Sequence, residues 1–133
     1  MEKLNCFKAY DIRGKVPSEL NSDLAYKIGR AFAKHVNANK VIVGYDIRKS
    51  SLEISEALMK GLTDAGSNVV NIGLCGTEMI YFSTPYLSAD GGIMITASHN
   101  PPEYNGMKFV KKDSVPVGYD SGLNIVEEMI LKN

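Results

Sequence analysis

The residues best suited to chemistry lie in one stretch, residues 96–108, which carries hydroxyl, imidazole, amide and ammonium groups between two apolar segments. Ser98, His99 and Asn100 come first, and a pair of prolines at positions 101–102 follows them. Proline lacks a backbone N–H and disfavours helical geometry in the residue before it. We therefore expect the Ser-His-Asn segment to form an irregular turn that presents Ser98 to solvent.

An exposed serine of this kind could carry a phosphoryl group. A phosphoserine has about −1.5 to −2 charges near neutral pH and needs several hydrogen-bond donors or cations around it. Lys108, His99, Asn100 and nearby backbone N–H groups are the donors that the same stretch offers. Local residues could thus hold a phosphate even though the chain as a whole is uncharged.

Simpler interpretations of the same residues remain open at this point. Segments rich in Ser, Asn, Pro and Gly are usually turns without chemistry, and Lys108 could be a solvated lysine of a strand. A hydrolase built on Ser98 and His99 is less favoured, because adjacent side chains usually diverge and no Gly-x-Ser-x-Gly elbow surrounds the serine. The residue types alone do not decide between a turn and a catalytic loop.

Two other loops carry charge at the end of an apolar segment. Residues 7–12 are expected to form a short opening strand that ends at Arg13 and Gly14, where the glycine permits a turn. The second loop, residues 46–51, contains Asp46 and Arg48, which we expect to form a supporting ion pair. This second loop could also be no more than the entry to a helix.

Apolar periodicity predicts the elements that position these loops. Leu24, Ile28, Phe32 and Val36 recur every four residues after a cap at Asn21 or Ser22, which indicates an amphipathic helix with a core-facing stripe. Ser50 and Glu53 have the spacing of a capping box for a second helix that stops near Gly66. Further strands are expected at residues 40–45, 68–72, 92–96 and 106–110, and further helices at residues 77–87, with Pro85 near its end, and 120–131.

The alternation of strands and helices favours an α/β fold, a three-layer α/β/α domain with a mostly parallel, mixed sheet covered on both faces. In open sheets of this kind, ligands bind beyond the carboxyl ends of the strands. The three loops at residues 10–15, 46–51 and 97–106 are therefore expected to converge at one edge of the sheet.

Composition sets outer limits on the function. The 133 residues, 44% hydrophobic and 23% charged, are expected to form a single domain over residues 1–133. Fifteen basic and fifteen acidic residues give no net charge that would attract nucleic acid or an anionic membrane. We expect no membrane segment, no signal peptide and a cytoplasmic location. Cys6 and Cys75, the two cysteines, are expected to be reduced and buried, and a disulfide between them is the less favoured alternative.

Read together, the three loops resemble the α-D-phosphohexomutase family. Residues 96–101 match its T-A-S-H-N-P-type serine motif, and residues 7–14 are similar to its F-x-A-Y-D-I-R-G start. Residues 43–51 resemble the family's V-G-x-D-x-R-x-S-S segment, and residues 104–108 resemble Y-N-G-x-K. The Gly-Thr-Glu at residues 76–78 is similar to the form found in bacterial phosphomannomutases, which supply GDP-mannose and polysaccharide synthesis.

This resemblance implies a role for each matched residue. Ser98 would be phosphorylated and would exchange its phosphoryl group with a mannose or glucose phosphate through a hexose 1,6-bisphosphate. Lys108 and Arg13 would stabilise the transferring group and assist proton movement, and His99 would act beside them in catalysis. Tyr10 and Asn100 would contact substrate or phosphate. The family also binds Mg²⁺ through a phosphoserine oxygen and three aspartates, so Ser98 would be a metal ligand through its phosphate.

Several family motifs do not occur in residues 1–133: the D-G-D-G-D-type metal loop, the G-E-x-S-G-type sugar loop and the R-x-S-G-T-type phosphate loop. The resemblance therefore implies the first of four domains, with the remaining domains of the parent enzyme as partners, and a chain that is inactive alone. Two alternatives stay open. One is a phosphoglucomutase, or less favoured a phosphoglucosamine mutase, and the other is a non-catalytic phosphoprotein or binding domain.

Overall fold

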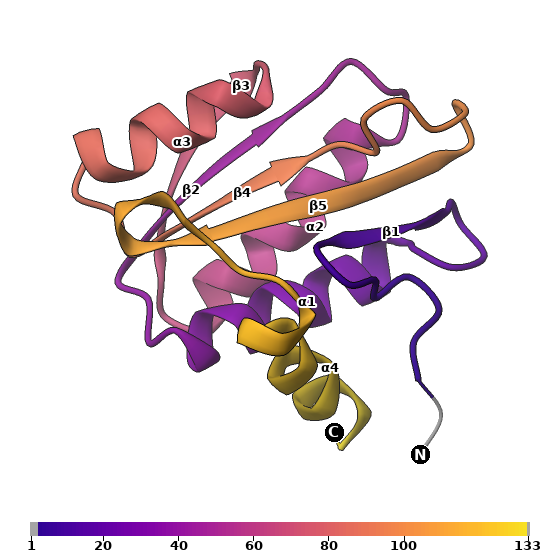
Figure 1. Cartoon of the computed structure of the whole chain (residues 1–133), viewed down its shortest axis with the longest axis horizontal. Coiled ribbons are helices and arrows are strands. Elements are labelled where there is room, and N and C mark those ends of the chain that lie inside the picture. Colours follow the sequence, from indigo (N-terminus) through magenta and orange to yellow (C-terminus); the bar gives the residue numbers. More distant parts are fainter. Residues whose placement is uncertain (1–2, 133) are drawn as a thin grey trace.

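The structure, a computed structural model, describes residues 3–132 (Figure 1). Within this range the chain forms α-helices and strands in largely alternating order, with two short 3₁₀ turns near the C-terminal end. The strands are β1 (Ile12–Lys15), β2 (Lys40–Tyr45), β3 (Asn68–Leu74), β4 (Gly91–Ile95), β5 (Tyr104–Lys111) and β6 (Val115–Pro116). The helices are α1 (Ser22–His35), α2 (Ser51–Asp64), α3 (Thr77–Tyr86) and α4 (Leu123–Leu131), and the 3₁₀ turns are η1 (Lys112–Ser114) and η2 (Tyr119–Ser121).

The strands form one mixed sheet in the order β1-β5-β4-β2-β3, with β6 paired to β5. Strand β2 pairs in parallel with both β3 and β4. Strand β5 pairs antiparallel with β4, β1 and β6, so within residues 3–132 it is the strand that runs against all the others. The prediction of a mostly parallel, mixed sheet is confirmed.

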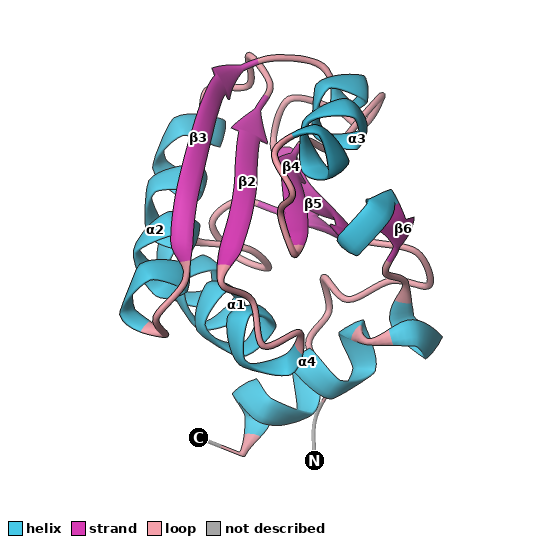
Figure 2. Cartoon of the chain, turned by 90° about the vertical axis from the view of Figure 1, so that its left-hand side faces the viewer, coloured by secondary structure: helices cyan, strands magenta, loops and turns pink. Residues whose placement is uncertain are grey.

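Helices cover both faces of this sheet (Figure 2). One core lies between the sheet and the pair α1 and α2, and it contains Phe32, Leu58 and Ile93. A smaller core under α3 contains Ile42, Ile80 and Met94. Since Ile93 and Met94 are neighbours in β4, they face opposite sides of the sheet and contribute to different cores. The three-layer α/β/α architecture is therefore the one expected from the sequence.

The predicted helix stripe forms part of the larger core. Ile28 and Phe32 are fully buried, while Leu24 and Val36 are partly buried and pack against the same cluster. The predicted cap is also present, because the Asn21 side-chain oxygen accepts a hydrogen bond of 2.9 Å from the backbone N–H of Leu24.

Two local predictions are wrong. Residues 7–12 do not form a strand: the chain turns back on itself, with an isolated bridge between Phe7 and Ile12, and β1 begins only at Ile12. Arg13 therefore lies inside a strand that pairs with β5 and not in a turn. The capping box at Ser50 is absent as well, because the Glu53 carboxylate accepts a hydrogen bond from the Ser22 hydroxyl across the helix pair instead.

Three smaller differences concern the C-terminal helix and the thiols. The predicted helix at residues 120–131 is divided into η2 and α4, and β6 was not predicted. Cys6 and Cys75 are both free thiols; Cys6 is buried, whereas Cys75 is half-buried. Burial raises the pKa of the Cys6 thiol to about 11.

No helix among residues 3–132 combines the length and apolar character that crossing a bilayer requires.

Candidate functional site

The three loops singled out in the sequence meet at one edge of the sheet. The backbone N–H of Asp46, just after β2, donates to the carbonyl of Ile95 at the end of β4 over 3.0 Å. The N–H of Thr96 donates to the carbonyl of Gly106 on β5 over 2.9 Å, and Gly106 in turn pairs with Arg13 on β1. Backbone pairing thus brings the beginning of β1, the end of β2 and the end of β4 together.

Ser98 lies in the loop that joins β4 to β5, and its side chain is exposed, as is that of His99. Its backbone has a φ of 55°, in the left-handed region that serine seldom occupies. Two hydrogen bonds shape the turn: the Ser98 N–H donates to the Thr96 hydroxyl over 3.0 Å, and the Asn100 N–H donates to the carbonyl of Ala97 over 3.0 Å. The serine is presented to solvent by an irregular turn, as the proline pair predicts.

A chain of charged hydrogen bonds links this loop to two cations. Arg13 donates from Nη1 to the Asn100 side-chain oxygen and from Nη2 to Asp11 Oδ1, each over 3.2 Å. Lys108 Nζ donates to Asp11 Oδ2, also over 3.2 Å. The Asp11 side chain is only 6% exposed, whereas those of Arg13 and Lys108 are 38% and 34% exposed. The buried Asp11 carboxylate therefore fixes both cations, and their exposed parts remain accessible to an anion.

The position of Lys108 follows from the alternation of side chains along β5. Met107 and Phe109 belong to the larger core on the α1 and α2 side, and Val110 belongs to the smaller core under α3. Lys108 therefore faces the same side as Val110, where α3 covers β2 and β4 but leaves this part of β5 open. The Lys108 side chain can therefore reach solvent while its backbone stays paired within the sheet.

Arg48, from the loop after β2, also binds the backbone of the serine loop. Its two terminal nitrogens donate to the backbone carbonyls of Ser98, Asn100, Pro101 and Tyr104 over 2.8–3.1 Å. The sequence predicted only the ion pair with Asp46, which is present with 3.4 Å between Arg48 Nε and Asp46 Oδ2.

A buried amide joins the same two loops. Asn105 is fully buried, and its side-chain nitrogen donates to the hydroxyls of Ser50 and Ser51 over 2.8 and 3.0 Å. The Ser51 hydroxyl donates in turn to Asp46 Oδ1 over 2.5 Å. The loop after β2 and the loop after β4 are thus bonded to each other through side chains as well as through Arg48.

The six predicted site residues divide into two groups. Arg13, Asn100 and Lys108 belong to the hydrogen-bonded chain next to the serine loop, which also contains Asp11, a residue that sequence reasoning missed. Tyr10 is 86% exposed at the tip of the preceding turn. The side chains of Ser98, His99 and Tyr10 make no hydrogen bond to another described residue, so they stay free to meet a ligand.

The described residues contain no group of three or more His, Cys, Asp or Glu side chains placed to hold a metal ion. Phosphate on Ser98 would add hard oxygen donors at the site, which suit Mg²⁺. The described residues therefore do not form a metal site by themselves, and Ser98 would contribute one ligand through its phosphate.

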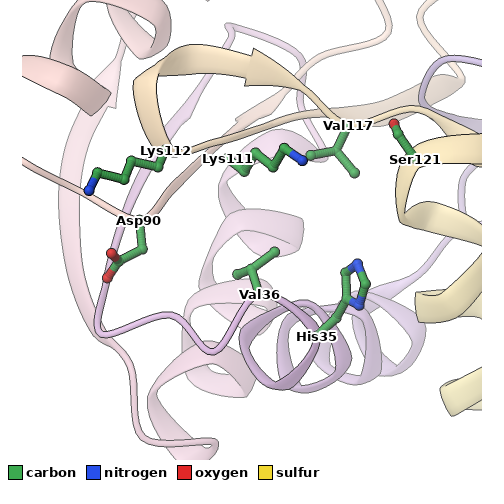
Figure 3. Close-up of a pocket in the computed structure, with 7 residues that line it drawn as sticks. All are labelled: His35, Val36, Asp90, Lys111, Lys112, Val117 and Ser121. Atoms are coloured by element: carbon green, nitrogen blue, oxygen red, sulfur yellow. The ribbon is translucent and has the colours of Figure 1, made fainter.

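A hollow with a volume of about 400 Å³ lies elsewhere in the described residues (Figure 3). Asp90, one of its lining residues, precedes β4, so the hollow lies towards the opposite edge of the sheet from Ser98. The Asp90 carboxylate is already used, because it accepts hydrogen bonds from the backbone N–H groups of Asn39 and Lys40. Its other lining residues are His35, Val36, Lys111, Lys112, Val117 and Ser121.

Taken together, the α/β/α domain presents an exposed serine in a loop that is hydrogen-bonded to Arg13 and linked through Asp11 to Lys108, an arrangement that could hold an anion near a hydroxyl. Comparison with known proteins gives the same class a name. The family described as phosphoglucomutase/phosphomannomutase, alpha/beta/alpha domain I, matches residues 4–133. The chain belongs to this family.

Relatives that match the whole chain support the same family assignment. A phosphomannomutase of Klebsiella pneumoniae is 50% identical over 133 residues, which are all of this chain and 85% of that protein. A phosphomannomutase of Escherichia coli is also 50% identical over 133 residues, but the chain spans only 29% of its length. A crystal structure of a phosphoglucomutase/phosphomannomutase family protein from Burkholderia thailandensis superposes with a TM-score of 0.88 at 35% identity, over 99% of this chain and 31% of that one.

Proposed function

We propose that the chain is the phosphoserine-carrying domain of a phosphomannomutase, in which Ser98 exchanges a phosphoryl group with a mannose phosphate. The observation that carries the proposal is the exposed Ser98 next to the Asn100–Arg13–Asp11–Lys108 chain of hydrogen bonds. The names of the relatives in Klebsiella pneumoniae and Escherichia coli support mannose as the sugar.

In the proposed reaction, the bond between Ser98 Oγ and phosphorus breaks as a sugar hydroxyl oxygen bonds to the same phosphorus. The proton that the sugar hydroxyl loses ends on Ser98 Oγ, so the serine is left as a hydroxyl and the sugar as a hexose 1,6-bisphosphate. The bisphosphate then returns its other phosphoryl group to Ser98 in the reverse sense. The net result is the interconversion of mannose 6-phosphate and mannose 1-phosphate.

The residues near Ser98 have complementary tasks. Arg13 and Lys108 face the charge on the transferring group, and cations fixed in place before the reaction stabilise such charge well. Lys108 also assists proton movement, and Asp11 keeps both cations in position. His99, Asn100 and Tyr10 line the approach to the serine and bind the substrate or its phosphate.

Mg²⁺ is the proposed metal, bound through the phosphate of Ser98 and by ligands outside residues 3–132. When bound, it would neutralise charge on the phosphoryl group. Because the described residues contain no group of three or more His, Cys, Asp or Glu side chains placed to hold a metal ion, we expect the 133-residue chain to bind Mg²⁺ weakly and to turn over sugar phosphates negligibly. The remaining domains of the parent are its proposed partners, and the proposed setting is GDP-mannose and polysaccharide synthesis in the cytoplasm.

The test joins this chain to the remaining domains of its parent, or of the Escherichia coli relative, and measures conversion of mannose 1-phosphate to mannose 6-phosphate. Glucose 1-phosphate is assayed in parallel, because preferred turnover of glucose would assign the domain to a phosphoglucomutase instead. Ser98→Ala should abolish turnover. It should also prevent phosphorylation, so the intact protein should lack the added mass of the phosphoryl group, about 80 Da for HPO₃. Turnover that survives Ser98→Ala would refute the proposal, and so would robust mutase activity of the 133-residue chain alone.

A further inference from the structure

The serine loop contains few contacts of its own that would fix its shape. Within residues 97–103 the backbone N–H of Asn100 donates to the carbonyl of Ala97, and the N–H of Tyr104, just after it, donates to the carbonyl of Pro101. Ser98 nevertheless has a φ of 55°, a conformation that L-residues avoid unless their surroundings hold them in it. The Ser98 N–H also donates to the Thr96 hydroxyl, and Arg13 donates to the Asn100 side chain. Neither bond holds the Ser98 carbonyl, so a further residue outside the loop must supply that restraint.

Arg48 is placed to supply it. Nη2 donates to the carbonyls of Ser98 and Asn100 over 2.9 and 2.8 Å, and Nη1 donates to those of Pro101 and Tyr104 over 2.8 and 3.1 Å. A planar guanidinium is the one side-chain group that presents several donors in a fixed fork. The four oxygens span the loop from the serine to the first residue of β5.

The guanidinium is itself fixed at its base. Arg48 Nε lies 3.4 Å from Asp46 Oδ2, and the backbone N–H of Arg48 donates to Asp46 Oδ1 over 3.1 Å. The Arg48 side chain is only 12% exposed. Its orientation is therefore set by the loop after β2, so that the loop after β4 is held to a rigid part of the sheet.

The held carbonyls also determine where the loop's donors point. In a trans peptide the C=O and the following N–H point in opposite directions, and the bond between Ser98 and His99 is trans. With the Ser98 carbonyl turned to Arg48, the His99 N–H points away from Arg48, and it makes no hydrogen bond to another described residue. Pro101 and Pro102 carry no N–H, so turning the carbonyls of Asn100 and Pro101 towards Arg48 leaves no donor stranded.

We propose that Arg48 is a positioning residue for phosphoryl transfer: it holds Ser98 in its left-handed conformation and aims the His99 N–H outwards as a donor for the phosphoryl group. This inference rests on the proposed function and deepens it. The terminal nitrogens of Arg48 bond carbonyls of the loop, so the proposed role needs no contact of Arg48 with the sugar or the phosphorus. It acts through the backbone of the loop, and its geometry matters more than its charge.

Three variants separate geometry from charge. Arg48→Ala removes the fork, whereas Arg48→Lys keeps the charge but has one nitrogen, which cannot reach four carbonyls in two directions. Lys49→Ala is the matched control, because it removes one positive charge from the same loop at an exposed residue. Each variant is made in the 133-residue chain and in the protein joined to its remaining domains.

The first readout is amide hydrogen exchange at Asn100 and Tyr104 in the 133-residue chain, compared with amides of β4. We expect Arg48→Ala to increase the exchange rates of these loop amides at least about 10-fold more than those of the β4 amides. The reason is that local opening of the loop no longer has to break the hydrogen bonds from Arg48 to the loop carbonyls. The second readout is steady-state turnover. A serine displaced by about 1 Å should lower kcat about 100-fold with KM changed little.

Arg48→Lys should fall between Arg48→Ala and the unmodified protein in both readouts, and Lys49→Ala should match the unmodified protein. Wild-type exchange and kcat in Arg48→Lys would overturn the proposal, since charge alone would then suffice, and this holds even where Arg48→Ala does not fold. Unchanged loop exchange in a folded Arg48→Ala, or a change in KM alone, would overturn it too. Turnover that survives Ser98→Ala refutes the proposed function instead, and the exchange result then still decides whether Arg48 holds the loop.

Discussion

Asp11 offers the sharpest test of how the two cations are held. Its carboxylate accepts one hydrogen bond from Arg13 and one from Lys108, each over 3.2 Å, and its side chain is 6% exposed. Asp11→Asn keeps the size and shape of the side chain but removes the charge, so a neutral amide must face two cations. The amide can still accept through its oxygen but turns an NH₂ group towards one of them.

The expected loss of stability follows from these contacts. Hydrogen bonds to charged groups contribute about 1.5–3 kcal/mol each when buried, whereas exposed ion pairs contribute about 0–1 kcal/mol. Because Arg13 and Lys108 are 38% and 34% exposed, water recovers part of each interaction. We therefore expect Asp11→Asn to lower the free energy of unfolding by about 1–3 kcal/mol, with an unchanged dependence on denaturant.

Urea unfolding of the 133-residue chain measures this change. Asp120→Asn is the matched control, because it removes one negative charge from an exposed side chain and should change stability by less than about 0.5 kcal/mol. The double variant Asp11→Asn, Lys108→Gln should lose less than the sum of its two single variants, since they remove a shared contact. An Asp11→Asn protein as stable as the Asp120→Asn control would refute the idea that this carboxylate holds the cations.

Two further predictions concern the scaffold. A Cβ atom at Gly61 would lie 2.1 Å from the backbone carbonyl of Tyr26 on α1, so Gly61→Ala should force α1 and α2 apart and lower the free energy of unfolding by about 1–3 kcal/mol, measured in urea; an unchanged or raised stability would contradict this close contact. The pKa of the Cys6 thiol is raised by burial from 9.0 to about 11, so its contribution to stability is complete below pH 9 and disappears as the pH rises towards 11. The unfolding free energy should therefore fall more steeply between pH 9 and 11 in the unmodified chain than in Cys6→Ala, and equal slopes would count against it.

Most of the fold could be predicted because its elements carry strong local signals. The apolar runs of β2 and β4 and the four-residue stripe of α1 each match one structure, and the boundaries fall within a few residues of those found. The exceptions depend on distant partners. Residues 7–12 have the composition of a strand, but Ile12 finds its partner on β5, so pairing starts where the prediction ended it.

The failed capping box has a similar cause. The spacing of Ser50 and Glu53 is right for reciprocal capping, yet each side chain forms a hydrogen bond to a distant residue instead. Ser22 on α1 donates to Glu53, and Asn105 on β5 donates to Ser50. A local motif yields here to contacts made by residues more than thirty positions away, which no local pattern contains.

The site residues divide along the same line. Ser98, Asn100 and Lys108 stand in one stretch of sequence, so their types and the proline pair were enough to make them candidates. Asp11 and Arg48 were not predicted in their observed roles, because a carboxylate between two cations and a guanidinium among four carbonyls exist only after three loops have met. A sign was present in the sequence: each lies two residues from the opposite charge with which it pairs.

The residues of the site come from parts of the sheet that differ in how easily they open. Ser98 and Lys108 belong to one hairpin, β4 and β5, whose ladder is local. Arg13 lies instead in β1, a four-residue strand at the edge of the sheet, and Asp11 directly precedes that strand. Short edge strands open more readily than central ones. Opening of β1 would remove Arg13 and the carboxylate behind Lys108 while Arg48, anchored after the central strand β2, still held the serine loop. The order of the serine loop and the placement of the cations are therefore separable properties. Destabilising variants in β1 should disturb the placement of Arg13 and Lys108 before they disturb the order of the loop.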